Sequence, residues 1–281
     1  MSDAEDKSLR KLLAAAHIEV MPIAGIEEHL RSLATGATVA VTCSPSMGID
    51  TTLEATALIC GLGFDAVPHL AARQITGMQH LKRILDELSE SGVNSIFVPG
   101  GDLSPPAGEF DSALQVLQAM STFDHGITDI GVAAYPDGHP FMDDETLVDV
   151  LRAKQEFATH CVTQMCFNGE TITNWIDDTR KQDISLPVRI GLPGAVERKK
   201  LLAYSLRIGV GDAARFSLKQ PKTIRKLMAA KTYQPDELVL HLAGYLENAQ
   251  ANMAGLHLYT FNQVEETIAW RAAFLAALDE K

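Results

Sequence analysis

Residues 79–101, QHLKRILDELSESGVNSIFVPGG, contain one complete unit of the pattern that decides the fold. The first half predicts an amphipathic helix over Gln79–Ser91, followed by Gly92, a residue type that suits a helix end. The apolar residues of this half follow the helical spacing i, i+3, i+4, i+7, and they are Leu81, Ile84, Leu85 and Leu88. The second half, Ser95–Gly101, is a short apolar run that ends in proline and glycine, which predicts a buried strand.

The same unit, a short run rich in Val, Ile and Ala next to a longer stretch of helical period, recurs along the chain. The eight predicted strands are His17–Ile23, Thr38–Ser44, Asp65–Leu70, Ser95–Gly101, Asp129–Pro136, His160–Phe167, Pro187–Gly194 and Leu256–Phe261. Strands separated by helices pair in parallel through right-handed crossovers, and eight such units are the number that closes a barrel. The sequence therefore predicts an α/β fold, a single (β/α)8 TIM barrel over residues 1–281, with residues 1–16 as a short N-terminal helical extension.

The connection between the seventh and eighth predicted strands is much longer than the others. It contains helical patterns that include Pro221–Ala230 and Pro235–Ala251, which predict an extended helical crossover. The alternative fold is an open doubly wound sheet, but no G-x-G-x-x-G turn follows the first strand and no Walker A sequence occurs. The glycine cluster Gly209–Gly211 lacks a strand before it and is better explained as a turn between helices.

Composition and charge exclude several classes of protein. Of the 281 residues 46% are hydrophobic, which is enough for a packed core and excludes a disordered or fibrous chain. Lys and Arg total 24 against 36 Asp and Glu, so the net charge of −12 argues against a nucleic-acid partner. No apolar run approaches the roughly 20 residues of a membrane helix, and the acidic N-terminus does not resemble a signal peptide, so we expect a cytoplasmic protein that makes no membrane contact.

The four cysteines show no CxxC spacing. This pattern predicts neither a disulfide framework nor a zinc site, and no metal site is expected.

Polar residues stand at the ends of most predicted strands. They are Glu19, Thr42, Cys43, His69, Asp102, Tyr135, Asp137, His139, Gln164, Tyr259, Thr260 and Asn262. The functional groups of a barrel of this kind gather at the carboxyl ends of its strands. Burying such side chains without partners costs several kcal/mol, so a single binding mouth is the simplest explanation for all of them.

Each of these residues also has a purely structural interpretation. His69 could satisfy a loop carbonyl, and Asp102 after two glycines could cap the next turn or helix. Glu19 is harder to explain in this way, because strand alternation places it on the face opposite Ile18 and Val20. A carboxylate that points into a barrel usually has a function.

Together these segments resemble the methylenetetrahydrofolate reductase family. The similar segments are HIEVMP (17–22), AVPHL (66–70), VPGGDLSPP (98–106), GVAAYPDGHP (131–140), VTQMCFN (162–168) and GLHLYTFN (255–262). They occur in the family's order and extend from about residue 17 to residue 265. The family fold is a (β/α)8 barrel, in agreement with the strand count.

The resemblance implies an oxidoreductase in which NADH or NADPH reduces FAD, and the flavin reduces 5,10-methylenetetrahydrofolate to 5-methyltetrahydrofolate or runs the reverse oxidation. Glu19 matches the general acid that protonates the folate, Asp102 an aspartate close to both flavin and pterin, and Gln164 and Tyr259 positions that contact the folate. The positions that match residues holding FAD are Thr42, His69, Gly101, Tyr135, His139 and Lys154. The family often forms dimers or tetramers, so the resemblance also implies a homo-oligomer.

The sequence differs from the family at two informative positions. Gly100 replaces an arginine that faces the cofactor, and Gln263 replaces an arginine that suits the folate glutamate tail. Two alternatives therefore stay open beside the flavoenzyme. One is a reductase that passes hydride directly from the nicotinamide to the folate without flavin, and the other is a non-catalytic folate or nucleotide binder on the same barrel.

Overall fold

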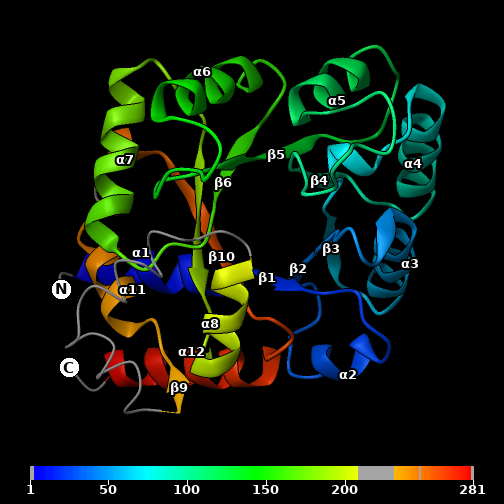
Figure 1. The fold of residues 1–281 in the computed structure, drawn as a ribbon. Helices are drawn as coiled ribbons and strands as arrows, with labels where there is room; N and C mark the ends of the chain where they lie inside the picture. Colours follow the sequence, from blue (N-terminus) through cyan, green and yellow to red (C-terminus); the bar gives the residue numbers. More distant parts are fainter. Residues whose placement is uncertain (1–2, 208–230, 247, 280–281) are drawn as a thin grey trace.

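The computed structural model describes residues 3–207, 231–246 and 248–279. Within these ranges, eight parallel strands form one sheet in the order β3-β2-β1-β10-β7-β6-β5-β4 (Figure 1). The strands are β1 (His17–Val20), β2 (Thr38–Val41), β3 (Asp65–Pro68), β4 (Ser95–Val98), β5 (Asp129–Ala134), β6 (His160–Thr163), β7 (Val188–Pro193) and β10 (Met253–Tyr259). All eight predicted strands are present.

The two outer strands of this order, β3 and β4, meet where β3 ends. His69 forms a parallel bridge with Phe97, and the N–H of Leu70 donates to the carbonyl of Phe97 at 2.8 Å. The N–H of Ala72 donates to the carbonyl of Pro99 at 3.0 Å. The sheet is therefore a nearly closed barrel, which confirms the barrel prediction, and the open-sheet alternative is wrong.

Helices connect the strands and lie around the barrel (Figure 1). They are α1 (Asp3–Ala14), α2 (Ile26–Leu30), α3 (Gly48–Gly61), α4 (Met78–Glu90), α5 (Ala113–Met120), α6 (Asp144–Lys154), α7 (Gly169–Lys181), α8 (Arg198–Arg207), α11 (Asp236–Ala243) and α12 (Val264–Asp279). The predicted helix Gln79–Ser91 is α4, and its four apolar residues at helical spacing are all buried. Among the described residues, no helix is long and apolar enough to cross a membrane.

The long crossover between β7 and β10 differs in part from the prediction. The predicted helix Pro235–Ala251 was too long, because α11 ends at Ala243 before Gly244 and only a short 3-10 turn, Ala249–Ala251, follows. An antiparallel pair, β8 (Val196–Glu197) with β9 (Thr232–Tyr233), was not predicted. The predicted helix Pro221–Ala230 and the glycines of 209–211 lie outside the described residues.

Most strands also end earlier than their apolar runs. The first was predicted to reach Ile23, but β1 ends at Val20. The reason is that the next N–H, of Met21, donates to the side chain of Asn262 at 2.7 Å instead of to a neighbouring strand. Side-chain hydrogen bonds of this kind replace the ladder where the chain leaves the sheet.

Many side chains inside the barrel are polar, and the main apolar core lies between the sheet and the helices. Ile18 and Val20 are almost fully buried in that core, whereas Glu19 between them faces inward. Two glycines leave room for large interior side chains. A Cβ on Gly191 would overlap the carbonyl of Thr163 and lie 2.7 Å from the Tyr259 ring, and one on Gly131 would lie 2.8 Å from His160 Nε2.

Gly191→Ala should destabilise the fold by about 2 kcal/mol or more, because the added methyl overpacks a closed interior. Gly61→Ala is the matched control, since a Cβ on Gly61 meets no atom within 4 Å and the residue is helical. Urea denaturation of both variants measures the difference. Equal stability of the two variants would show that Tyr259 does not need the space above Gly191.

Candidate active site

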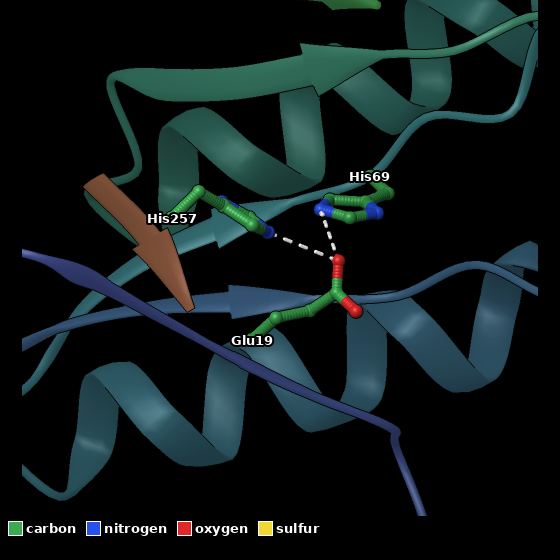
Figure 2. Close-up of side chains that lie close together, drawn as sticks. All are labelled: Glu19, His69 and His257. Atoms are coloured by element: carbon green, nitrogen blue, oxygen red, sulfur yellow. Dashed lines mark hydrogen bonds and ion pairs between the residues drawn. The ribbon is translucent and has the colours of Figure 1, made fainter. Parts of the chain in front are cut away.

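Three buried side chains from different parts of the barrel form a cluster, and Glu19 stands at its centre. Figure 2 shows that His257 and His69 both approach one oxygen of the Glu19 carboxyl group. Glu19 Oε2 lies 3.0 Å from His257 Nε2 and 3.9 Å from His69 Nε2. The exposed fractions of the Glu19, His257 and His69 side chains are 11%, 4% and 9%. The barrel therefore holds a largely buried cluster of one acid and two imidazoles.

Strand pairing and two side chains fix the position of Glu19. Strands β1 and β10 are parallel neighbours, with Glu19 beside Tyr259 in the register. Thr260 Oγ1 donates to the backbone carbonyl of Glu19 at 2.6 Å. Asn262 accepts from the N–H of Met21 and donates to its carbonyl at 3.1 Å. Asn262 has a positive φ of 61°, which turns the chain after β10 so that this amide faces β1.

Burial sets the protonation of the cluster. It raises the pKa of Glu19 to about 7, against a smaller opposite effect of His69. It also lowers the pKa of His69 to about 4 and the pKa of His257 to about 3. Near neutral pH the two imidazoles are therefore neutral, while Glu19 can hold or release a proton. A group with this behaviour suits general acid catalysis.

A second group of predicted residues gathers at the loops after β4 and β5. Asp102 is exposed in the first loop, and Tyr135 and His139 stand in the second, with ring centroids 4.9 Å apart. Burial, helped by the charge of Asp102, raises the pKa of Tyr135 to about 12. Asp102 also acts on the pKa of His139, which burial lowers. The structure thus brings these three residues together.

Lys154 is the last residue of α6, and its side chain is buried. Burial lowers the pKa of its ammonium group to about 8, and the thiol of Cys161 is the titratable group with the largest effect on it. The charge of Lys154 also lowers the pKa of His139, with a smaller effect than that of Asp102. No ion pair joins Lys154 to an acid within the described parts of the chain. Among these residues it is a buried cation without a paired anion.

Tyr259 connects the two groups. Its hydroxyl donates to the carbonyl of Thr163 at 3.0 Å, and its ring lies 4.9 Å from the His257 ring. Burial raises the pKa of Tyr259, and both Glu19 and Tyr135 add to the increase. The acid cluster and the loop after β5 therefore belong to one continuous region at the carboxyl ends of the strands.

The remaining predicted residues lie at strand ends and mainly make local contacts. The N–H of Thr42 donates to Val20, and Gln164 uses its side-chain oxygen to accept from the N–H of Met165 at 2.8 Å. Gly101 has φ +85°, and a Cβ there would lie 3.0 Å from Ala71 Cβ. Gln263 is buried and accepts from the N–H of Glu197 at 2.9 Å. Its side chain is therefore engaged within the protein.

Sequence reasoning missed the polar residues deeper in the barrel. His257 was the nearest omission, although it alternates with Leu256 and Leu258 as Glu19 alternates with its apolar neighbours, so the same signal could have found it. Below it, the His17 ring lies 6.3 Å from the His257 ring. His160 Nδ1 lies 3.1 Å from an oxygen of Asp129 at the amino ends of the strands. Buried polar side chains thus extend through much of the interior.

The Glu19 cluster also has the ligand types of a metal site, which the sequence did not predict. The ligand atoms of Glu19, His69 and His257 all lie within 4.8 Å of one another. Two imidazoles and a carboxylate are a set that zinc and non-haem iron accept. The hydrogen bond between Glu19 and His257 already pairs two of these three atoms.

The model of the family described as methylenetetrahydrofolate reductase matches residues 28–206. The chain belongs to the methylenetetrahydrofolate reductase family. The matched part contains His69, Asp102 and the loop after β5, whereas Glu19 and His257 lie outside it. Membership therefore does not by itself assign a role to the acid cluster.

Individual relatives are distant. The 5,10-methylenetetrahydrofolate reductase of Escherichia coli is 25% identical over 219 residues, covering 74% of this chain and 69% of its own length. A probable methylenetetrahydrofolate reductase (NADPH) of Caenorhabditis elegans is 25% identical over 84% of this chain. The Buchnera aphidicola enzyme is 27% identical over 51% of it. The matches span only 37% of the C. elegans protein and 48% of the Buchnera protein.

Solved structures agree on the fold. An uncharacterised protein of Clostridium thermocellum, described as binding two copies of 5-methyl-5,6,7,8-tetrahydrofolic acid, has a TM-score of 0.67 at 11% identity. The alignment covers 96% of this chain and 99% of that one. A phosphonopyruvate hydrolase has a TM-score of 0.51 at 10% identity, covering 98% and 87%. At these identities the likeness concerns the architecture alone.

In this member of the methylenetetrahydrofolate reductase family, Glu19→Gln should change how stability depends on pH. Because the folded-state pKa of Glu19 is raised from 4.5 to about 7, its proton stabilises the folded state at low pH. That contribution is lost progressively between about pH 4.5 and pH 7. Glutamine stays neutral, so the variant should match the wild type near about pH 4 and exceed its melting temperature at pH 8.

The matched control is Glu27→Gln on the exposed face of α2. Its melting temperature should follow the wild type at every pH. If Glu19→Gln also follows the wild type from pH 5 to pH 8, the carboxyl group does not carry a raised pKa.

Proposed function

We propose that this protein catalyses the reduction of 5,10-methylenetetrahydrofolate to 5-methyltetrahydrofolate, or the reverse oxidation, with NADH or NADPH as the electron donor and FAD as the carrier. The observation that carries the proposal is Glu19, a buried carboxyl group whose pKa of about 7 lets it keep a proton near neutral pH. Family membership supplies the substrate class, and the C. elegans relative is described as a probable methylenetetrahydrofolate reductase (NADPH).

Glu19 would act as the general acid. The methylene group of the substrate bridges two amine nitrogens, and one carbon–nitrogen bond must break before the carbon can accept hydride. Protonation of N10 by Glu19 makes that nitrogen a leaving group, and the bond electrons stay on it. The product of this step is a 5-iminium cation on the folate.

Asp102 would stabilise that cation. A fixed carboxylate near a developing positive charge lowers the free energy of the charged state relative to water. Gln164 and Tyr259 are the positions we assign to contacts with the folate itself.

Several observations fit an FAD diphosphate and ring system. Lys154 is a buried cation with no paired anion among the described residues, Tyr135 and His139 form an aromatic pair, and Gly101 allows a close backbone turn against Ala71. These residues, with Thr42, His69 and Asp102, would hold the flavin. When bound, flavin would supply hydride transfer between the nicotinamide and the folate.

Gly100 favours a second candidate, a reductase that works without flavin. Glycine at this position offers no cation to the cofactor. The space beside it is open, because an added Cβ would meet no atom within 4 Å. In that case the nicotinamide would reach the iminium carbon directly, and Glu19 would keep the same role.

Glu19→Gln should lose folate reduction by at least about 100-fold, because glutamine cannot donate the proton to N10. NADH oxidation with menadione as acceptor should persist, since that reaction needs no protonation of folate. Steady-state assays with each acceptor measure the two rates. Full folate turnover in the variant would show that Glu19 is not the acid, and loss of both activities would indicate a structural role.

Gly100→Arg should tighten FAD binding by about tenfold or more, because a charge-assisted hydrogen bond contributes roughly 1.5–3 kcal/mol. Gly100→Gln is the control of similar reach without charge. Titration of the purified proteins with FAD, followed by absorbance from about 350 to about 500 nm where flavin absorbs, measures the affinity for FAD. A wild type that shows no spectral change with FAD, yet oxidises NADH with methylenetetrahydrofolate, would establish the second candidate.

A further inference from the structure

The two oxygens of the Glu19 carboxyl group have different surroundings. Oε2 faces both histidines, whereas Oε1 points away from them in Figure 2. Oε1 has no hydrogen-bond partner in the described parts of the chain. Because Oε1 is neither hydrogen-bonded nor fully enclosed, it contributes to the 11% of the side chain that is exposed. Oε1 is therefore the oxygen that a substrate can reach.

The protonation of His257 decides how Oε2 is used. The Nδ1 of His257 is enclosed without a partner. A hydrogen on Nδ1 would leave a buried N–H donor without an acceptor, which is rarer in proteins than an under-used acceptor. A hydrogen on Nε2 instead donates to Glu19 Oε2 at 3.0 Å. The Nε2–H form is therefore preferred.

Charges around the pair support this arrangement. Glu19 faces His69 after β3 and Tyr259 on β10. On its other sides His257 is influenced by Arg189 on β7 and His160 on β6, both of which lower its pKa after the larger effect of burial. Its ring also lies near that of His17 on β1. The cation of Arg189 disfavours a second proton on His257, so the imidazole acts as a neutral donor.

We propose that His257 is a positioning residue for Glu19: its Nε2–H occupies Oε2 and thereby places the acid proton on Oε1, where the substrate can accept it. This inference rests on the proposed function for the identity of the substrate. The placement of the proton itself follows from the geometry of the pair. Without the donor, the proton can reside on either oxygen, and the carboxyl group can rotate.

The experiment compares His257→Leu, which removes the donor, with His257→Gln, which keeps a neutral N–H near the position of Nε2. Infrared difference titration of the protonated carboxyl band, assigned by its loss in Glu19→Gln, gives the pKa of Glu19 in each protein. Because a hydrogen bond to the charged form lowers a carboxyl pKa, His257→Leu should raise the pKa of Glu19 by about one unit. His257→Gln should leave it close to the wild-type value.

Folate turnover supplies a second measurement. At pH 7, kcat of His257→Leu should fall about tenfold or more with little change in KM, and His257→Gln should recover most of the loss. In the Glu19→Gln background, His257→Leu should cause no further loss, because the residue acts only through Glu19. Circular dichroism confirms that each variant is folded.

Three results would overturn the inference. The first is an unchanged Glu19 pKa and unchanged kcat in His257→Leu. The second is a loss in His257→Gln as large as in His257→Leu, because a neutral donor would then not be sufficient. The third is wild-type folate turnover that EDTA abolishes and Zn²⁺ restores, because His257 would then be a metal ligand.

The outcome for His257 is separable from the outcome for the proposed function. If the wild type does not turn over methylenetetrahydrofolate with either nicotinamide, the proposed function fails. The infrared titration still decides whether His257 controls the Glu19 proton, since it needs no substrate.

Discussion

Glu19 Oε2 and His257 Nε2 form a hydrogen bond between two neighbouring strands inside the barrel, and we propose that the chemistry of the site depends on it. An isolated carboxylate in such a place would be strongly destabilised, so it gains a proton or a donor. Here it has both options, because its pKa is raised to about 7 and a neutral imidazole faces it. The side chains of Thr260 and Asn262 hold the backbone on either side of the acid.

This arrangement divides the protein into two layers with different tasks. The apolar core between the sheet and the helices contains residues such as Ile18, Leu258 and Ile190, and it supplies the burial that stabilises the fold. The interior of the barrel instead holds imidazoles, carboxylates and Tyr259, with space left by Gly191. The burial that stabilises the fold and the polar groups of the candidate site therefore lie on opposite faces of the sheet.

The acid cluster and the loops after β4 and β5 meet at Tyr259. The charges of both Glu19 and Tyr135 raise its pKa. Such an arrangement suits a reaction in which one ligand receives a proton from the acid cluster and an electron pair from a donor at the loops after β4 and β5. Gly100 stands in the loop after β4, where we propose that the cofactor binds. The question of flavin is therefore distinct from the question of general acid catalysis.

The sequence by itself determined the eight strands, the barrel and the inward direction of Glu19, because alternation with period two and helical spacing are local properties of the chain. It did not determine where β1 ends, since that depends on an amide of Asn262, 241 residues away. Nor did it show that His257 faces Glu19, although both alternate with apolar neighbours. Only closure of the barrel brings β1 beside β10, and the burial that follows sets the pKa of the acid. Local patterns specify which way a side chain points, whereas its partners and its protonation depend on contacts that exist only in the folded chain.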